Sequence, residues 1–387
     1  MGQQFSRDPY AVYAKLRERG PVHHVRMPEG ADCWLVVGYD EVRATLNDAR
    51  LSKHWDNASD TLGLPAVAAG PHMLVSDHAQ HTRLRKLVAK QFTPKRVEAM
   101  VPLVQRTTDD LLDAMLRSPD RRADLVEALS FPLPMSVICE LLGVPGLDRE
   151  AFRHWSSTTI GSAPPAEKSK AAQEVAVYLA DLVAAKRQSP GDDLMSDLIR
   201  TTDEDGDRLS PDELIGMAWL LLVAGHETTV NLISNGVLAL LNHPDQLAAL
   251  RADPGLLDNA VEEMLRYDGP VETSTYRFTT EPMEIGGTLV PGGGELVLVA
   301  LADADRDPAR FDDSHRFDIR RDARGHVAFG HGIHYCLGAP LARLEGRIAV
   351  RSLLERCPDL ALDTHPDALT WREGLLMRGP YRLPVRF

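Results

Sequence analysis

The chain has 387 residues, of which 44% are apolar and 26% are charged, as expected for a globular protein with a buried core. Its formal net charge is −13, so it would gain nothing from the counterion release that drives binding to nucleic acid, and we exclude that class of partner. No window approaches the roughly 20 consecutive apolar residues that a membrane span needs. No apolar stretch follows a basic start, as it would in a signal peptide.

The four cysteines are widely spaced and contain no Cys-x-x-Cys pair. Disulfides are therefore not expected, and a reducing cytoplasm is the expected location. The cysteines are Cys33, Cys139, Cys336 and Cys357. The question that they raise is whether one of them is a metal ligand.

In chain order, a first short strand is expected at residues 33–37. Apolar positions three and four residues apart then predict helices at residues 94–116, 164–187, 211–241, 256–267 and 339–356. Two strand-like stretches, 283–290 and 295–300, flank a Pro-Gly-Gly-Gly turn at 291–294 and are interpreted as a hairpin. The pattern predicts a mainly helical protein with a small sheet.

The helix that begins at Pro211 is expected to be the longest. Ser210 is a good N-cap, proline suits the first helical position, and Asp212 and Glu213 place acidic groups in the first turn. About 30 residues would span roughly 45 Å. Because residues 217–224 are nearly all apolar, this helix should run through the core.

A glycine-rich loop carries the strongest chemical pattern. Residues 329–338 read FGHGIHYCLG, and a helix follows directly. Three glycines describe a tight loop, and placing Cys336 at a helix start directs backbone N–H groups at its sulfur. Both effects favour the thiolate, which is the form that binds metal. The alternative is a buried structural cysteine, which we adopt for Cys139 and Cys357.

A second pattern lies in the middle of the long helix, where residues 224–229 read AGHETT. Gly225 would cost about 1 kcal/mol relative to alanine, so it needs a reason. Glu227 and Thr228 place an acid beside an alcohol, which suits proton delivery. A zinc site of the His-Glu-x-x-His kind is excluded because Val230 occupies the last position. A polar kink with only local hydrogen bonds stays an alternative.

Two further patterns are weaker on their own. Glu263 and Arg266, at a spacing of three, are usually only a surface pair. His81 and Arg85 share one helix face at a spacing of four, although a basic run such as this is usually a solvated face.

Taken together, these motifs resemble the cytochrome P450 family, whose haem-binding loop F-G-x-G-x-H/R-x-C-x-G is matched without a mismatch. The resemblance extends over essentially the whole chain and is greatest to actinobacterial P450s that hydroxylate macrolides and related polyketides. It implies a mainly α fold with small β-sheets, in one domain over residues 1–387. The helix-rich core would cover about 75–270 and 335–360. The small β regions would lie near the amino terminus and at about 270–300.

The resemblance also implies roles for individual residues. Cys336 would be the axial ligand of the iron of haem b, promoting O–O cleavage. Glu227 and Thr228 would be catalytic, delivering the protons that this cleavage requires. Glu263 and Arg266 would form a structural network with Arg321, although the adjacent Arg320 is an alternative third member. The other residues that would bind the haem are His81, Arg85, Ala224, Gly225, Arg277, Phe329, His334 and Gly338.

Substrate contacts would come from scattered apolar residues. They are Leu74, Val75, Val223, Val271 and Leu376. An apolar and sizeable ligand is implied. Because residues 61–75 contain no Asp or Glu to pair with a cationic amino sugar, a neutral macrolactone or other neutral polyketide is expected. Asp60 would overturn this expectation if it pointed inward.

The reaction implied by the resemblance is hydroxylation or epoxidation, with one atom of O₂ inserted into the substrate. Electrons would come from NAD(P)H through a reductase and an acidic ferredoxin, docked by a basic patch of Arg83, Lys86 and Lys90. The protein would be a monomer that does not bind membranes. The alternatives are a non-catalytic haem sensor, for which no output domain is visible, and an O₂-independent dehydratase, which loss of the acid–alcohol pair would favour.

Overall fold

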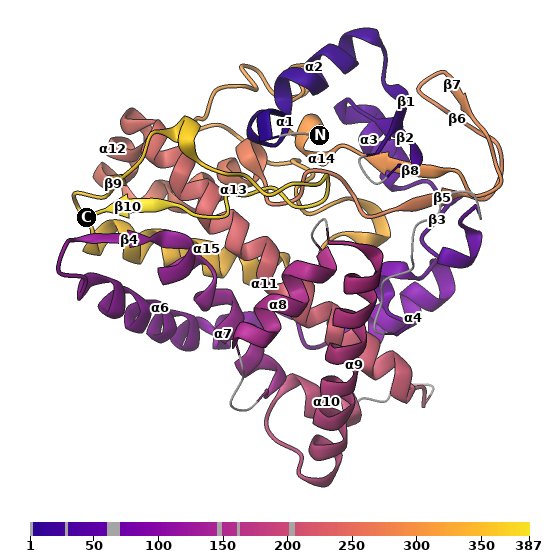
Figure 1. Cartoon of the computed structure of the whole chain (residues 1–387), viewed down its shortest axis with the longest axis horizontal. Helices are drawn as coiled ribbons and strands as arrows, with labels where there is room; N and C mark the ends of the chain where they lie inside the picture. The colour runs from indigo at the N-terminus through magenta and orange to yellow at the C-terminus, as the bar shows by residue number, and fades with distance from the viewer. Residues whose placement is uncertain (1–2, 28–29, 60–69, 145–148, 161–162, 201–205) are drawn as a thin grey trace.

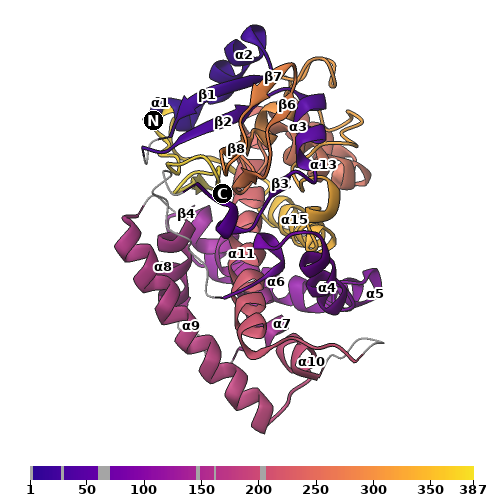
Figure 2. The same cartoon turned by 90° about the vertical axis from the view of Figure 1, so that its right-hand side faces the viewer.

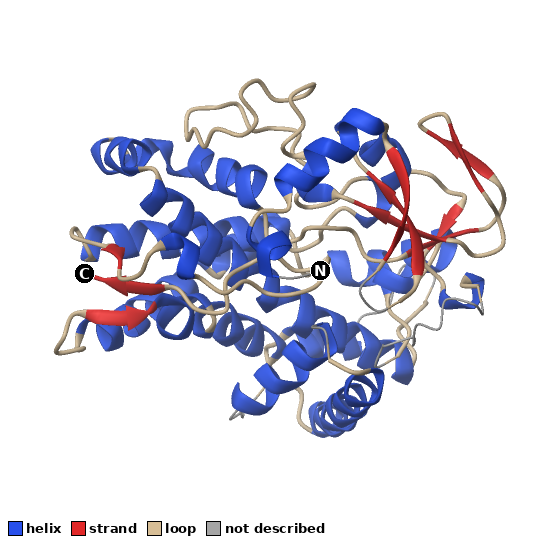
Figure 3. Ribbon diagram, turned by 45° about the horizontal axis from the view of Figure 1, so that its top comes forward, coloured by secondary structure: helices blue, strands red, loops and turns tan. Residues whose placement is uncertain are grey.

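The computed structural model describes residues 3–27, 30–59, 70–144, 149–160, 163–200 and 206–387. Helices make up most of it, and the strands gather at two places, as Figure 3 shows. The predicted mainly helical fold with small sheets is confirmed. None of the described helices is both long enough and apolar enough to cross a membrane.

The helices of the amino-terminal half are α1 (Gln3–Arg7), α2 (Tyr10–Arg19), α3 (Tyr39–Leu46), α4 (His78–Ala89), α5 (Pro94–Ala99), α6 (Val101–Leu116), α7 (Pro132–Leu142), α8 (Arg149–Ile160) and α9 (Pro165–Gln188). The helices that follow are α10 (Leu194–Arg200), α11 (Pro211–Asn242), α12 (Pro244–Ala252), α13 (Leu257–Asp268), α14 (Leu301–Ala304) and α15 (Ala339–Arg356). Short turns of helix include η3 (Met73–Val75), η4 (Val126–Ser130) and η6 (Gly332–His334).

The strands form three small sheets. Their bounds are β1 (Val22–Arg26), β2 (Asp32–Val36), β3 (Leu51–Ser52), β4 (Arg122–Asp124), β5 (Arg277–Thr279), β6 (Met283–Ile285), β7 (Thr288–Val290), β8 (Leu296–Val299), β9 (Ala361–Leu362) and β10 (Pro384–Arg386). The largest sheet has the order β1-β2-β8-β5-β3, with β2 and β8 parallel and the other pairs antiparallel. A second sheet has the order β4-β10-β9.

The predicted hairpin around residues 291–294 is wrong. The stretch 283–290 is not one strand but two, because Gly286 and Gly287 adopt positive φ and turn β6 back onto β7. A two-residue glycine turn of this kind is the standard connection of a tight hairpin. The Pro-Gly-Gly-Gly segment instead leads into β8, which pairs with β2 and β5.

The longest helix, α11, has 32 residues and begins as predicted. The Ser210 side chain accepts from the Glu213 N–H, and the Glu213 carboxylate accepts from the Ser210 N–H. This reciprocal pair satisfies N–H groups that the first turn would otherwise leave without partners. The predicted helix at 94–116 is divided at Met100 into α5 and α6.

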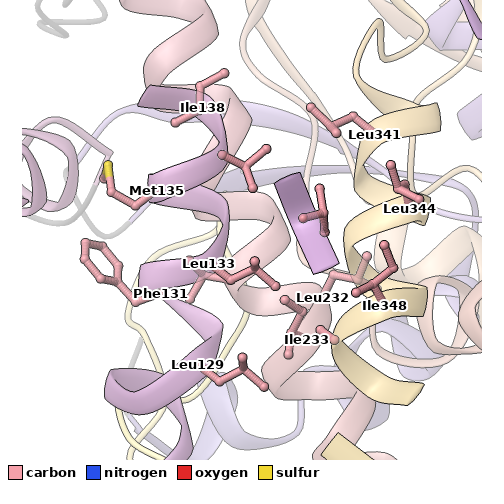
Figure 4. Close-up of a cluster of buried hydrophobic side chains, with 14 of the residues drawn as sticks. Leu129, Phe131, Leu133, Met135, Ile138, Leu232, Ile233, Leu341, Leu344 and Ile348 are labelled. Carbon is pink, nitrogen blue, oxygen red and sulfur yellow. The ribbon is translucent and has the colours of Figure 1, made fainter. Parts of the chain in front are cut away.

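The main core surrounds α11. Figure 4 shows side chains of η4 and α7 on one side, Leu232 and Ile233 of α11 in the middle, and Leu341, Leu344 and Ile348 of α15 on the other. Residues of α11 from Gly216 to Val223 are all buried, as their apolar run predicts. A helix packed between other helices over most of its length has a fixed position, so it can hold reacting groups in place.

Hydrogen bonds connect residues near the amino terminus with residues near the carboxyl terminus. The Gln3 amide donates to the Trp371 carbonyl and accepts from its N–H, both at 3.1 Å. The Arg378 guanidinium donates to the Ser6 and Arg7 carbonyls. In Figure 1 the yellow carboxyl-terminal segment crosses the middle of the molecule beside α1. In Figure 2 this segment and α1 both lie on the same side of α11. The residues 371–378 are therefore held by α1.

Candidate active site

The loop at residues 329–338 brings Cys336 to the start of α15. The Cys336 N–H donates to the Phe329 carbonyl at 2.9 Å, which closes the loop. Gly330 and Gly332 both have positive φ, and a Cβ on Gly332 would lie 2.7 Å from Asn47 Oδ1. The Arg343 guanidinium lies 4.5 Å from the centre of the Phe329 ring. The glycines are needed for this tight path because side chains there would be strained or would clash.

The groups around the Cys336 sulfur shift the pKa of its thiol in opposite directions. Burial raises the pKa of its thiol, whereas the N–H groups of Gly338 and Ala339 and the charges of Arg85 and Arg343 lower it. Backbone donors and nearby guanidiniums stabilise a thiolate. These are the surroundings expected of a sulfur that serves as a ligand to a metal cation, which supplies further positive charge.

Five basic side chains gather beside this loop. The His81 and His334 rings have their centres 4.4 Å apart, and Arg85 on α4 donates to the Tyr335 carbonyl at 2.7 Å. Burial and the charges of Lys53, His81, Arg277 and Arg85 together lower the pKa of His334 to about 2. Burial alone lowers the pKa of Arg277 to about 10.

Few negatively charged groups lie beside this basic cluster to balance its positive charge. Both ring nitrogens of His81 lack a hydrogen-bond partner among the described residues. Burial lowers the pKa values of Lys53 and His81, and the Asp77 carboxylate raises them. This carboxylate accepts hydrogen bonds from the Lys53 N–H and the Ser52 hydroxyl. Buried cations that repel one another require anions. The two propionates of a haem meet this requirement, so the residues present fit that group.

Lys53 is the member that sequence reasoning missed. Its side chain is buried, and Nζ donates to Thr275 Oγ1 and to the Tyr276 carbonyl at 2.6 Å. Burial, followed by the charge of Arg277, lowers its pKa well below the usual value. It lies just after β3, which pairs with β5, the strand that carries Arg277. This strand pairing brings Lys53 to the cluster, and no sequence motif predicts the pairing.

On α11, the small residues leave one face open. Ala224 is exposed although the eight residues before it are buried, and Gly225 and Thr228 are partly exposed. Thr228 Oγ1 donates to the Ala224 carbonyl at 2.9 Å. A Cβ on Gly225 would lie 2.9 Å from Ile138 Cδ1 of α7, so packing supplies a reason for this glycine. The helix is continuous through this segment.

Glu227 is buried and held by groups from three elements. Its Oε1 accepts from the Ser156 hydroxyl of α8 at 3.1 Å and lies 3.7 Å from His226 Nε2, and its Oε2 lies 3.4 Å from Arg372 Nη1. Burial would raise the pKa of this carboxyl, but His226, Arg372 and Ser156 outweigh it and hold the pKa at about 2. Glu227 is therefore a carboxylate at neutral pH.

The Glu263–Arg266 pair is fully buried instead of lying on the surface. Two parallel hydrogen bonds of 2.7 and 2.8 Å join the two side chains. Of the two candidate arginines, Arg321 reaches the pair, with Nε 3.4 Å from Glu263 Oε1, and it also donates to the carbonyls of Asp312 and Asp313. Arg266 binds the carbonyls of Asp305 and Ser314. This network fixes the segment that precedes the cysteine loop.

The expected substrate contacts come from separate elements. Leu74 and Val75 belong to η3 and are partly buried, and Val223 lies on α11. Val271 forms an isolated bridge with Met377, and the Leu376 carbonyl accepts from Glu272 N–H, which places these two segments side by side. Asp60 and residues 61–69 lie outside the described residues.

The expected basic patch needs a correction. Arg83 was expected to face outward, but it forms ion pairs with Asp207, at 2.9 Å, and with Glu213 at the start of α11. Its position on α4 directs it to α11 instead of to solvent. Lys86 on α4 and Lys90, which directly follows α4, are exposed.

The sequence model described as "Cytochrome P450" matches residues 163–384. The cytochrome P450 monooxygenase PikC of Streptomyces venezuelae is 60% identical to this chain over 387 residues, which cover 100% of this chain and 93% of that protein. The 6-deoxyerythronolide B hydroxylase of Saccharopolyspora erythraea is 48% identical, with 99% of this chain and 96% of that protein covered.

Solved structures agree with these relatives. The P450 monooxygenase TamI bound to tirandamycin C matches with a TM-score of 0.92 and 44% identity, covering 100% of this chain and 99% of that chain. A fold shared to this degree at this level of identity carries over the arrangement of helices around the cysteine loop. The chain belongs to the cytochrome P450 family and is a haem-thiolate monooxygenase.

Proposed function

We propose that this monooxygenase hydroxylates or epoxidises a bulky, mostly apolar macrolide or other polyketide. The observation that supports it most is the similarity over the whole chain to PikC and to 6-deoxyerythronolide B hydroxylase, together with the solved structure of TamI with tirandamycin C. The expected contact residues Leu74, Val75, Val223, Val271 and Leu376 are all apolar, which suits such a ligand.

Haem b, held by Cys336, supplies the activation of O₂ when it is bound. Cys336 would hold the iron and donate electron density to it, and Phe329 and Arg343 lie beside this cysteine. Lys53, His81, Arg85, Arg277 and His334 would hold the propionates and so fix the orientation of the group. Gly225 keeps α11 close to Ile138 of α7, whereas the nearest atom to a Cβ on Gly338 would be the Cys336 sulfur at 3.9 Å.

On the other side of the site, the Thr228 hydroxyl is held toward the Ala224 carbonyl, where it can pass a proton on. Glu227 accepts a proton and donates it to the Thr228 hydroxyl, which replaces the proton that Thr228 has passed on. The reaction consumes two electrons and two protons, places one oxygen atom in the substrate and releases the other as water. His226, Arg372 and Ser156 lower the pKa of Glu227 and so favour its ionised form between these proton transfers.

We further propose a neutral substrate, because no described residue among the expected contacts places a carboxylate where an amino sugar would need one. We propose NAD(P)H, a reductase and an acidic ferredoxin as the electron source. Lys86 lies on α4 and Lys90 directly follows it, and both are exposed. Because Arg85 of α4 contacts the cysteine loop, a partner on this face would be near Cys336.

The experiment is a Soret titration of the purified ferric enzyme with neutral macrolactones and with amino-sugar macrolides. A low-spin to high-spin shift with the neutral members, and a weaker one with the cationic members, is expected. A shift only with the amino-sugar macrolides contradicts the neutral preference, and the absence of any shift from all members contradicts the macrolide proposal.

The role of Cys336 is tested separately. Ferrous wild-type enzyme with carbon monoxide should show the strongly red-shifted Soret band of thiolate ligation, and Cys336→Ala should lose this band and all turnover. Cys139→Ala, a buried cysteine on α7, is the matched control and should keep both. A histidine-like band in folded wild-type protein would contradict the assignment of Cys336.

A further inference from the structure

One side of α11 beyond Glu227 is polar although it is fully enclosed. Asn231, Ser234 and Asn235 follow Glu227 at spacings of four, seven and eight, so all four lie on one helix face. Their exposed fractions are 0%, 0% and 1%, against 2% for Glu227. A run of polar side chains inside a helix that is otherwise apolar requires partners.

Several polar atoms of these side chains accept or donate no hydrogen bond within the described part of the chain. Among the described residues, no hydrogen bond reaches Glu227 Oε2, either side-chain atom of Asn231, Ser234 Oγ or Asn235 Oδ1. The facing loop adds Arg372 Nε and Trp371 Nε1 to this set. Buried polar atoms are nearly always hydrogen-bonded, and internal water is the usual partner where protein groups do not reach.

Contacts with the segment at residues 371–379 link Glu227, Asn231 and Asn235 of this face. Arg372 Nη1 is 3.4 Å from Glu227 Oε2, and the Arg372 N–H donates to the Gly379 carbonyl at 2.9 Å. A Cβ on Gly379 would lie 2.2 Å from Asn231 Oδ1, so the backbone there touches Asn231. The Asn235 amide then donates to the carbonyls of Asp268 and Arg378, both at 3.0 Å.

Beyond Asn235, the last turns of α11 line a cleft of about 490 Å³. The cleft is lined by residues that continue the same α11 face and by the side chains next to Asn235. They include Leu238, Asn242, Asp268, Trp371 and Arg378. The cleft lies beside α2, whose Tyr10 donates to the Asp268 carboxylate at 2.6 Å.

We propose that a line of buried water runs from this cleft along the polar face of α11 to Glu227, and that it supplies protons from bulk solvent to the reaction. Glu227 needs such a route because it and its partners Ser156 and His226 are buried. Protons enter at the cleft, pass along water held by Asn235, Ser234 and Asn231, and reach the Glu227 carboxylate. The electrons arrive from the redox partner, so only protons travel along this line.

The first test does not depend on turnover. A high-resolution crystal structure of the holoenzyme should show ordered water hydrogen-bonded to Asn231 Oδ1 or Nδ2, Ser234 Oγ and Glu227 Oε2. A dry segment between Asn231 and Asn235 would overturn the proposal.

The second test uses substitutions that remove the anchors of the water and no protein–protein hydrogen bond. Asn231→Leu is close to isosteric, and Ser234→Val fills the space beside the helix, whereas Ser234→Ala leaves room for water. Product formed per NAD(P)H should fall roughly tenfold in Asn231→Leu and Ser234→Val, with a matching rise in peroxide release and a larger solvent isotope effect. Ser234→Ala should stay near the wild type.

Thr45→Val is the matched control, because Thr45 of α3 is also a buried hydroxyl without a partner among the described residues but lies outside the α11 path. Normal carbonyl spectra and normal Soret titrations would show that each variant is folded and binds substrate. If Asn231→Leu and Ser234→Val match Thr45→Val in coupling and in solvent isotope effect, the line does not carry protons. If Asn231→Leu fails to fold, the contrast between Ser234→Val and Ser234→Ala decides.

Discussion

Glu345 on α15 is a fully buried carboxyl whose Oε2 has no partner among the described residues. Burial raises its pKa from 4.5 to about 8. The folded protein therefore binds a proton that the unfolded chain releases between these two values. Stability from this group is fully present below about pH 4.5 and is lost as the pH rises to about 8.

We expect Glu345→Gln to remove this dependence, because glutamine keeps the shape and carries no titrating proton. The free energy of unfolding of the wild type should fall by up to about 1.4 kcal/mol per pH unit more than that of the variant across this range. Denaturant unfolding from pH 5 to pH 8 measures the difference. Glu355→Gln, exposed on the same helix, should keep the wild-type slope. Equal slopes for wild type and Glu345→Gln would contradict the prediction.

At this scale, the sequence predicted residues that belong to contiguous motifs. Roles for Cys336 and for the Glu227–Thr228 pair could be predicted because each motif is local and its geometry follows from one loop or one helix, and these roles stay predictions. Lys53 could not, because a strand pairing between residues more than 200 positions apart brings it to Arg277. Arg83 was misjudged for the same reason, since its partner Glu213 lies 130 residues away.

At the scale of elements, the approach of the loop at residues 70–71 to α11 depends on Gly216. A Cβ on Gly216 would lie 2.3 Å from the Pro71 carbonyl oxygen and 2.8 Å from Gly70 C. These are backbone atoms, so the loop itself would have to move. The same loop leads into η3, which carries Leu74 and Val75, and its displacement would change the expected substrate contacts.

Gly216→Ala is therefore expected to destabilise the protein by about 1–3 kcal/mol through overpacking, which exceeds the gain of roughly 1 kcal/mol in helix propensity. It should also weaken the substrate-induced Soret shift. Thermal unfolding and the Soret titration measure the two effects. Gly346→Ala on α15 is the control, because the nearest atom to its Cβ would be Leu232 Cδ2 at 3.3 Å. A variant as stable as the wild type, with unchanged titration, would be evidence against this role for Gly216.

The helices with clear caps and strong apolar periodicity were predictable, as α11, α13 and α15 demonstrate. The sheet was not, because β8 pairs with β2 across more than 250 residues while the local turn suggested β7 as its partner. Hairpin signals describe neighbours in sequence, whereas the five-stranded sheet is assembled from distant segments.

At the scale of the whole molecule, an enzyme of net charge −13 must still receive electrons from a partner that we propose is acidic. Docking of such a partner needs a local positive face. Two exposed lysines, Lys86 on α4 and Lys90 just after it, are the candidates for this face. Attraction between exposed charges weakens as salt increases, since the screening length falls to about 8 Å at physiological ionic strength.

Reversing both charges, Lys86→Glu with Lys90→Glu, should lower ferredoxin-supported turnover at low salt, and the difference from wild type should shrink as salt rises. Turnover rates at several salt concentrations measure this. Lys15→Glu on α2 carries the same kind of charge change outside α4 and is the control. Unchanged rates and an unchanged salt dependence in the double variant would exclude this face as the docking site.

The hydrogen bonds between the two ends of the chain have a consequence for folding during translation. Gln3 reaches its partner Trp371 only after nearly the whole chain has left the ribosome, because 368 positions separate them. The same late segment brings Arg372 to Glu227. During synthesis, domains form from the amino terminus onward. Because α15, which covers one side of α11, and Arg372 are both made late, neither the core around α11 nor the ion pair of Glu227 can be complete before the last steps of translation.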